Sequence, residues 1–258
     1  MSAPAAPRVF DAHLHVVDPR FPLWANAGYT PEPFTAADYR EQTERLGVRG
    51  GAVVSGSFQR QDQTYLLDAL ARLGPAFVGV TQLPASAPDR EVLRLDAAGV
   101  RAVRFNLRRG GSATLREMPA LAARVHALAG WHAEVYVDGA DLPGLAPTLR
   151  ALPAVVIDHL GLRAAGQEAL LRLVADGAYG KATGFGRLDF DPVPFVRRLV
   201  AERPDRVLFG TDLPSTRAPR PFQAADLRAV REAAGEHAEA VCWANAVRLY
   251  RPRETQGA

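Results

Sequence analysis

Short apolar runs alternate with amphipathic stretches along most of this 258-residue chain. Each run has the length of a strand, is rich in valine and alanine, and is bounded by glycine, proline or polar residues, which predicts buried strands. The predicted strands are residues 9–15, 51–55, 76–81, 100–105, 133–137, 154–158, 180–184 and 207–210.

Between these runs, apolar residues recur with helical spacing. Thr35 and Asp38 are typical of a helix start, and Gly47, Gly74 and Gly99 follow the predicted ends of three helices. The predicted helices are residues 35–46, 62–73, 89–98, 119–128, 142–149, 167–175, 194–201 and 224–249.

The alternation of strands and helices predicts a parallel sheet, because parallel strands need a crossover connection. Eight such units predict a closed (β/α)8 TIM barrel, an α/β fold in a single domain at residues 9–251, with flexible segments at 1–8 and 252–258. A doubly wound open sheet is the alternative, but no glycine-rich phosphate loop follows the first strand. Residues 20–34, rich in proline, glycine and aromatics, are interpreted as a loop over the barrel mouth.

The composition, with 48% hydrophobic and 23% charged residues, is ordinary for a globular protein. It indicates no particular function, but it helps to exclude some classes of function. The 31 Lys and Arg interleave with the 28 Asp and Glu, so the net charge of +3 does not argue for nucleic-acid binding. Cys242 is the only cysteine, which excludes an intrachain disulfide and favours a reducing compartment. No signal peptide or membrane-length apolar run is recognisable, so we expect a cytoplasmic protein without a membrane partner. The sequence leaves the oligomeric state open.

Two histidines separated by one leucine end the first predicted strand. Side chains alternate along a strand, so His13 and His15 project from the same face. Two imidazoles at a strand end can bind a metal ion, or can polarise a carbonyl without one. A pair of hydrogen-bonded barrel histidines without chemistry is the structural alternative, and the residues at the other strand ends decide between the two.

Further polar residues stand near the carboxyl ends of later strands, where TIM-barrel enzymes carry their active sites. They are Arg104 and Asn106 on the fourth strand, Glu134 and Tyr136 on the fifth, and His159, Arg187 and Asp212 after the sixth, seventh and eighth. Alone, each type has an ordinary structural explanation, such as a salt-bridged arginine, a satisfied core histidine or a carboxylate that caps a turn. Their gathering at one rim favours an active site.

The order of these residues resembles the amidohydrolase superfamily, which carries HxH on strand one, His on strand six and Asp on strand eight. The matching segments are His13-Leu14-His15, Asp158-His159-Leu160-Gly161 and Gly210-Thr211-Asp212-Leu213-Pro214. Within the superfamily the chain is similar to the lactonase branch that contains 2-pyrone-4,6-dicarboxylate lactonase, through Tyr29-Thr30-Pro31 and the segment 98–106. The similarity spans about residues 10–250. It implies a hydrolase that opens the lactone ring of a small carboxylated substrate, in the breakdown of aromatic compounds.

The resemblance also bears on metal content. Classical binuclear members carry a bridging Lys or Glu on strand four and a His on strand five, where this chain has Asn106 and Tyr136. Neither is a strong zinc ligand, and the pyrone lactonase works without a metal, so we expect metal-independent hydrolysis and no cofactor. The alternative is one divalent ion, Zn or Mn, as in mononuclear relatives. Its ligands would be His13, His15, His159 and Asp212.

The resemblance implies a role for each residue of the rim. Asp212 is expected to activate a water as general base, helped by a pKa that partial burial raises. His13, His15 and His159 are expected to polarise the ring carbonyl and to stabilise the oxyanion. Arginines hold carboxylates through two-pronged contacts. The residues expected to contact the anionic lactone are Tyr29, Ser57, Arg104, Tyr136, Arg187 and one of Arg108 and Arg109, of which we choose Arg109.

One segment departs from the family's pattern. After the GTD-x-P turn the pyrone lactonase has a His and then an Asn that contacts substrate, whereas this chain has Ser215-Thr216-Arg217. The exact lactone therefore stays open, with sugar lactones and muconolactone-type acids as alternatives to the pyrone dicarboxylate. Two other functions also stay open: a metal-dependent decarboxylase of the same superfamily, and a barrel that only binds small anions.

Overall fold

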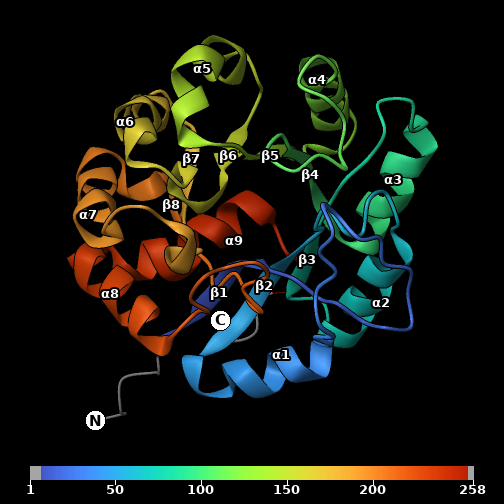
Figure 1. Ribbon diagram of the computed structural model, residues 1–258, viewed down its shortest axis with the longest axis horizontal. Helices are drawn as coiled ribbons and strands as arrows, with labels where there is room; N and C mark the ends of the chain where they lie inside the picture. Colours follow the sequence, from blue (N-terminus) through green and yellow to red (C-terminus); the bar gives the residue numbers. More distant parts are fainter. Residues whose placement is uncertain (1–6, 255–258) are drawn as a thin grey trace.

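A computed structural model of the protein describes residues 7–254, so most of the predicted flexible segments at 1–8 and 252–258 lies outside the described residues. Over the described range, parallel strands form one eight-stranded sheet in which neighbours follow chain order (Figure 1). The strands are β1 (Val9–Leu14), β2 (Val48–Val54), β3 (Phe77–Thr81), β4 (Val100–Asn106), β5 (His132–Tyr136), β6 (Val155–Ile157), β7 (Tyr179–Ala182) and β8 (Val207–Phe209). Every predicted strand is confirmed, with the largest shift at β2, which begins at Val48 instead of Gly51.

The sheet is closed into a barrel by the segment that follows β8. The backbone N–H of Asp212 donates to the carbonyl of His13, and the N–H of His15 donates to the carbonyl of Leu213, both at 2.7 Å. These bonds join the first strand of the chain to the residues after its last strand. The predicted TIM barrel is therefore confirmed, and its seam runs through three of the predicted catalytic residues, His13, His15 and Asp212.

Helices surround the sheet and connect its strands (Figure 1). They are α1 (Ala36–Thr43), α2 (Thr64–Leu73), α3 (Asp89–Ala98), α4 (Met118–Ala129), α5 (Leu142–Arg150), α6 (Gln167–Ala175), α7 (Pro192–Glu202), α8 (Ala224–Ala234) and α9 (Asn245–Tyr250). Thr35 caps α1 as predicted, because its side chain accepts from the Asp38 N–H while the Asp38 carboxylate accepts from Thr35. Gly99 follows α3 with a φ of 105°, a backbone conformation that favours glycine.

The prediction of one continuous helix over residues 224–249 is wrong. Gly235 ends α8 with a φ of 55°, and a 3-10 turn over Gly235–His237 follows. The chain then passes through a π-helical turn, Ala240–Ala244, before α9 begins. Helical periodicity continued across the glycine, but the left-handed conformation at Gly235 cannot be part of an α-helix.

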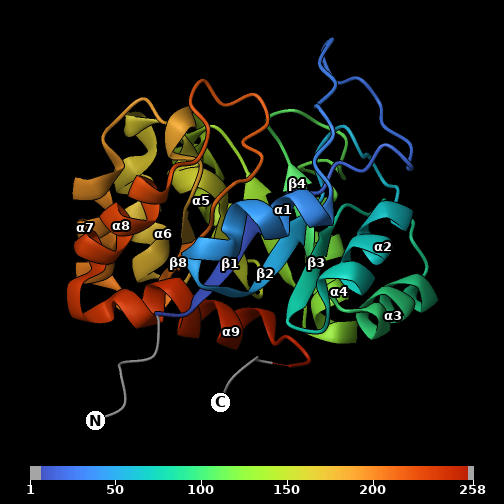
Figure 2. The same cartoon turned by 90° about the horizontal axis from the view of Figure 1, so that it is seen from below.

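Two apolar layers hold the barrel. The larger lies between the strands and the surrounding helices, and the smaller lies inside the barrel. Inside, Phe10 of β1 stacks on Tyr250 of α9 with ring centroids 5.4 Å apart, and Trp243 packs against Phe10 edge-on. Figure 2 shows α9 across one end of the barrel, while the loop after β1 stands at the opposite end. None of the helices in residues 7–254 is long and apolar enough to span a membrane.

A shift of register in β1 turns the side chains of the HxH pair toward the barrel interior. Phe10 and Ala12 pack inside the barrel, yet Leu14 packs in the outer layer. Regular alternation would place all three on one face, but the pairing of β1 with β2 slips between Asp11 and Leu14. The inward positions therefore change from even to odd numbers. His13 and His15 consequently face the interior together, as predicted.

Candidate active site

The four predicted catalytic residues come together in the barrel. His13 and His15 stand at the end of β1, and His159 and Asp212 follow β6 and β8 directly. Their side chains are buried. His159 and Asp212 adopt left-handed φ values of 51° and 62°, uncommon for residues other than glycine and typical of functional positions.

Asp212 lies at the centre of this group. Its Oδ1 is 3.6 Å from Nε2 of His15, 3.8 Å from Nε2 of His13 and 3.9 Å from Nε2 of His159. Its Oδ2 accepts a hydrogen bond from Nε of Arg187 at 2.6 Å. One carboxylate oxygen is thus fixed by a guanidinium, and the other faces three imidazoles.

The charge of Asp212 differs from the expectation. Burial acts to raise the pKa of Asp212, but the positive charge of Arg187, joined by the contacts with the neighbouring imidazoles, outweighs it and holds the pKa below its usual range. The prediction of a raised pKa is therefore wrong, because the paired guanidinium stabilises the ionised form. Asp212 is a carboxylate at neutral pH, which is the state that a general base requires.

Two of the histidines around it, His13 and His159, are neutral. Burial, joined by the charge of Lys181, lowers the pKa of His13 to about 3 despite the opposing charge of Asp158. Burial also holds the pKa of His159 well below its usual range. Neutral imidazoles carry one proton each, so each offers one donor and one acceptor nitrogen.

Hydrogen bonds assign the proton of His15. Its Nδ1 lies 2.7 Å from the carbonyl oxygen of Val54, and a carbonyl can only accept, so Nδ1 carries the proton. Nε2 of the same ring lies 3.6 Å from Asp212 Oδ1. Within residues 7–254, Oδ1 of Asp212 and Nε2 of His13 are buried without a hydrogen-bond partner. Buried polar atoms usually have a partner, so these two atoms are open to a water, a substrate or an ion.

These residues fit one divalent ion by their chemistry. Imidazole nitrogens and a carboxylate oxygen are zinc ligands, and one atom each of His13, His159 and Asp212 lie within 4.8 Å of one another. One atom each of His13, Glu134 and Asp158 also lie within 4.8 Å of one another, but the Lys181 ammonium already lies 2.5 Å from Glu134 and 3.4 Å from Asp158. The site thus suits a water or a single ion.

Below the HxH pair lies a buried group that the sequence analysis missed, which we call the floor cluster: His13, Glu134, Asp158 and Lys181. The Lys181 ammonium lies 2.5 Å from Glu134 Oε2, 3.4 Å from Asp158 Oδ1 and 3.4 Å from His13 Nδ1. Two carboxylates and one imidazole nitrogen thus surround the ammonium. The one available signal was a lysine in the middle of a predicted buried strand, where a charge needs a partner.

Two of the predicted substrate arginines are bound to carboxylates of the protein. Nε and Nη2 of Arg104 donate to Oδ2 of Asp158 at 3.1 and 2.9 Å, and Nη1 donates to the Ser55 carbonyl. Arg187 holds Asp212 through a hydrogen bond from Nε to Oδ2 at 2.6 Å. The sequence placed both at the rim, but it could not show that each neutralises a buried carboxylate.

A small cavity opens above His15 and His159. It is lined by the predicted residues Ser57, Arg104, Arg109, Tyr136 and Arg187, and also by Thr216 and Arg217. Arg108 instead pairs with Asp138 on the outer side of the barrel, so the geometry places Arg109, not Arg108, at the cavity. The predicted contact residue Tyr29 lies at the cavity's edge, where its ring packs under the Arg217 guanidinium.

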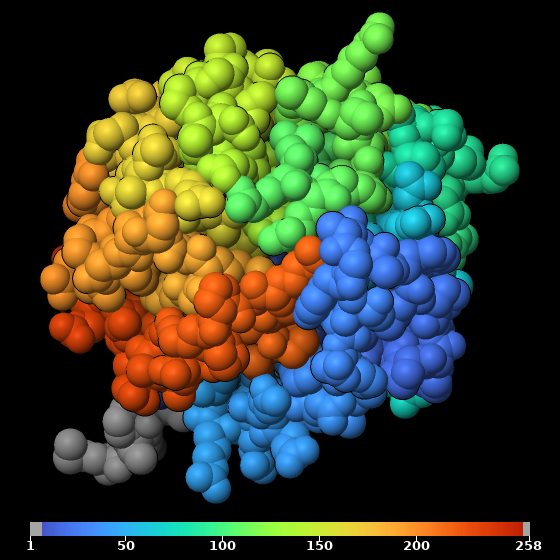
Figure 3. Space-filling model, viewed as in Figure 1, coloured from blue at the N-terminus to red at the C-terminus, as the bar shows by residue number. Residues whose placement is uncertain are grey.

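The cavity has a volume of about 30 Å³, close to the space of one water molecule. The loops after β1, β4 and β8 meet above it, and Figure 3 shows these blue, green and orange segments converging over the centre of the barrel. Asn26 connects them: its Nδ2 donates to the Arg109 carbonyl at 3.1 Å, and its backbone carbonyl accepts from Arg217.

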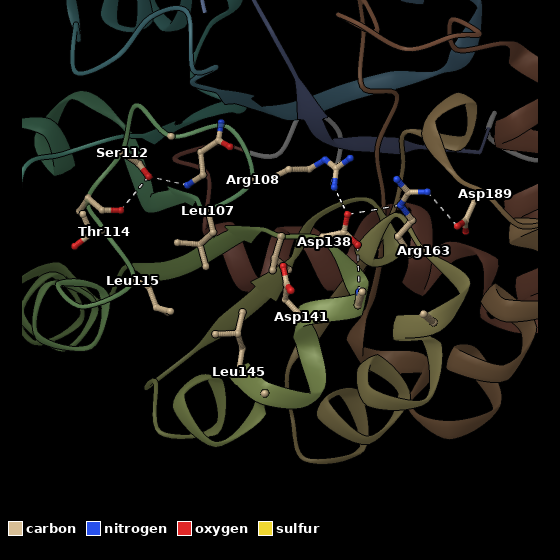
Figure 4. A pocket seen from close by; sticks show the side chains of 17 residues that line it. Leu107, Arg108, Ser112, Thr114, Leu115, Asp138, Asp141, Leu145, Arg163 and Asp189 are labelled. Atoms are coloured by element: carbon tan, nitrogen blue, oxygen red, sulfur yellow. Dashed lines mark hydrogen bonds and ion pairs between the residues drawn. The ribbon is translucent and has the colours of Figure 1, made fainter. Parts of the chain in front are cut away.

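A larger cavity, about 1290 Å³, lies outside the barrel between the β4–α4 loop and α5. Figure 4 shows its wall, where Arg108 and Arg163 approach Asp138, and Arg163 also approaches Asp189. None of His13, His15, His159 and Asp212 lines it. The larger cavity and the predicted catalytic residues therefore lie in different places.

Comparison with known proteins agrees with this geometry. The amidohydrolase family model matches residues 10–251. The chain belongs to the amidohydrolase family. Its 2-pyrone-4,6-dicarboxylate hydrolase relative from Comamonas testosteroni is 34% identical over 79% of this chain and 76% of its own length. This places the chain in the branch of that hydrolase, as the sequence motifs predicted.

Other relatives are named for different lactone reactions. A 4-sulfomuconolactone hydrolase from Rhizobium radiobacter is 32% identical over 80% of this chain and 75% of its own length. A D-galactarolactone isomerase from Agrobacterium fabrum is 30% identical, with 82% and 78% covered. A solved structure from Agrobacterium tumefaciens superposes with a TM-score of 0.84 at 25% identity, over 96% of this chain and 97% of that one.

Proposed function

We propose that this amidohydrolase opens the ring of a small anionic lactone by hydrolysis, with Asp212 as general base. The observation that carries the proposal is the environment of Asp212. Arg187 fixes one of its oxygens, and the other faces three imidazoles. Two of these, His15 and His159, line a cavity of about 30 Å³, which is the size of a water molecule. Relatives named as lactone hydrolases support the reaction class.

The first step takes a proton from water. Asp212 Oδ1 accepts it while the water oxygen attacks the carbonyl carbon of the lactone, and negative charge moves to the carbonyl oxygen. When the tetrahedral intermediate collapses, the ring C–O bond breaks and the leaving oxygen receives the proton from Asp212. The product is the ring-opened hydroxy acid.

We assign the polarisation of the ring carbonyl and the stabilisation of the oxyanion to the three histidines jointly. Nδ1 of His13 lies 3.4 Å both from the Lys181 ammonium, which donates, and from Asp158 Oδ1, which accepts. Nε2 of His13 and Nε2 of His15 face Asp212 Oδ1 at 3.8 and 3.6 Å, so the attacking water and the carbonyl oxygen would meet both rings beside the base. The carbonyl of Val54 holds the Nδ1 proton of His15 and thereby fixes the orientation of its ring.

We propose that this hydrolysis needs no metal ion. Arg187 supplies a fixed positive charge beside Asp212, and the usual ligand positions on β4 and β5 hold Asn106 and Tyr136. If an ion is bound, His13, His15, His159 and Asp212 would hold it, and it would supply a Lewis acid for the carbonyl. Cytoplasmic location remains a prediction from the single cysteine, Cys242.

The test is a panel of lactones assayed with the purified protein, alongside elemental analysis of the same sample. The panel contains 2-pyrone-4,6-dicarboxylate, a muconolactone and an aldarolactone. We expect ring opening with uptake of water, unchanged turnover after chelation, and no stoichiometric metal. Migration of the ester without ring opening would instead indicate an isomerase. Release of carbon dioxide that depends on added zinc or manganese would indicate a decarboxylase, and binding without turnover a binding protein.

A further inference from the structure

Arg217 belongs to the segment in which this chain departs from its branch. It follows β8 within Ser215-Thr216-Arg217, and it lines the same cavity as His15, His159 and Arg187. Its backbone adopts a left-handed φ of 61°, and Ser215 has a φ of 66°. This turn brings a long cationic side chain from the loop over the catalytic residues.

The Arg217 guanidinium is held in place at the mouth of the cavity. Its centre lies 4.4 Å from the centroid of the Tyr29 ring, and Nη2 donates to the backbone carbonyl of Asn26 and to its Oδ1, the latter at 3.2 Å. The same Asn26 holds the backbone of Arg109. We call Asn26, Tyr29, Arg109 and Arg217 the mouth group.

The mouth group carries positive charge without an internal counterion. Among residues 7–254, no carboxylate oxygen lies within 4.0 Å of a guanidinium nitrogen of Arg109 or Arg217, whereas Arg104 and Arg187 each have one. Burial and the charge of Arg109 lower the pKa of Arg217, which indicates that the two guanidiniums are close enough to repel each other. An anion between them would remove this repulsion.

We propose that Arg217 and Arg109 form a second anion subsite, which binds a carboxylate of the lactone remote from the ester that is cleaved. The proposal rests on the proposed function and specifies its substrate class as lactones with two anionic groups. The planar guanidinium of Arg217 suits a two-pronged contact with a carboxylate. A charge-assisted bond of this kind is stronger than the bonds to the Asn26 carbonyl and amide oxygens that it would replace.

The first test compares two pyrone lactones that differ by one carboxylate. The variant Arg217→Gln should raise KM for the dicarboxylate about 10- to 100-fold, the usual effect of losing a hydrogen bond to a charged group, and should alter KM for the monocarboxylate far less. Arg217→Lys should recover part of the loss. Arg220→Gln is the matched control, because Arg220 lies in the same loop but pairs with Asp226. Equal increases of KM for both lactones would overturn the subsite.

A binding measurement separates the subsite from the reaction. Calorimetry with isophthalate, a flat dicarboxylate, and with benzoate, its monocarboxylate counterpart, does not depend on turnover. We expect isophthalate to bind more tightly than benzoate, and Arg217→Gln to abolish that difference. If the difference is abolished but no lactone is hydrolysed, the subsite stands and the proposed function fails. If the parent protein does not distinguish the two anions, the subsite is wrong whatever the lactone panel shows.

Discussion

The floor cluster and the mouth group use positive charge in opposite ways. In the floor cluster, the Lys181 ammonium is fully buried, and Glu134 and Asp158 compensate its charge within 2.5 and 3.4 Å. In the mouth group, Arg109 and Arg217 have only neutral partners within residues 7–254. Both groups lie within the same barrel and are separated by the catalytic residues.

The difference separates the charge of Lys181, which stabilises the fold, from the charges of Arg109 and Arg217, which we propose bind a ligand. An unpaired charge in a dry interior costs several kcal/mol, so the floor cluster has to be complete before any substrate arrives. Near the surface the cost is lower, and an uncompensated guanidinium can be kept for an anion that comes from solution. Asp212 lies between the two groups, and its partner Arg187 makes it a charged base instead of a protonated acid.

The largest effect is expected at Asp212. Asp212→Asn retains the shape and an acceptor for Arg187 but removes the proton acceptor, so kcat should fall about 10²- to 10⁴-fold with the fold intact. Turnover and melting temperature are measured on the same sample. Asp226→Asn is the control, because Asp226 belongs to the capping box of α8 and has no proposed part in the reaction. An Asp212→Asn enzyme that melts early but turns over normally would make Asp212 a structural cap.

The next effect contrasts the two groups directly. Lys181→Met leaves Glu134 buried without its cation, whereas Asp158 keeps Arg104, so the free energy of unfolding should fall by about 3–5 kcal/mol in denaturant titrations. Adding Glu134→Gln should restore part of it, because the uncompensated buried charge is then removed. Arg217→Gln should change the same quantity by less than about 0.5 kcal/mol. Equal losses from Lys181→Met and Arg217→Gln would contradict the distinction drawn here.

The smallest effect is an absence of pH dependence. The pKa of Asp212 lies below its usual value of 3.8, so the base is ionised above that pH and is lost only as pH falls further. We expect kcat to stay flat from about pH 5 to about pH 8, measured with a saturating lactone in buffers of constant ionic strength. An acidic limb near pH 6 would assign the base to another group.

The fold could be predicted because its signals are local. Each strand was a continuous apolar run, and Thr35, Gly47 and Gly99 marked helix ends through their own conformational preferences. The failure at residues 224–249 has the same origin, since periodicity persisted beyond Gly235 while the backbone conformation there ended the helix.

The sequence predicted which residues form the candidate site, but it did not predict their ion pairs or the pKa of Asp212. The pKa of Asp212 was misjudged because the bond to Arg187 joins residues from different loops, and no periodicity encodes it. The floor cluster was missed for the same reason: Lys181, Glu134 and Asp158 come from three strand segments that meet only when the barrel forms. Arg217 was noticed as a departure, but its turn conformation was needed to place it at the cavity.

The seam between β1 and the residues after β8 has a consequence for the order of folding. Asp11 bonds Thr211 across 200 positions, and the backbone bonds of His13 and His15 to the same segment close the barrel. Contacts between such distant parts of a chain form late, because the entropy of closing a long loop must be overcome first. Asp212 and the HxH pair therefore meet only when the two ends of the sheet join. During refolding, turnover of the proposed lactone should appear after helical structure has recovered, because a chain that lacks its last strand lacks the candidate site.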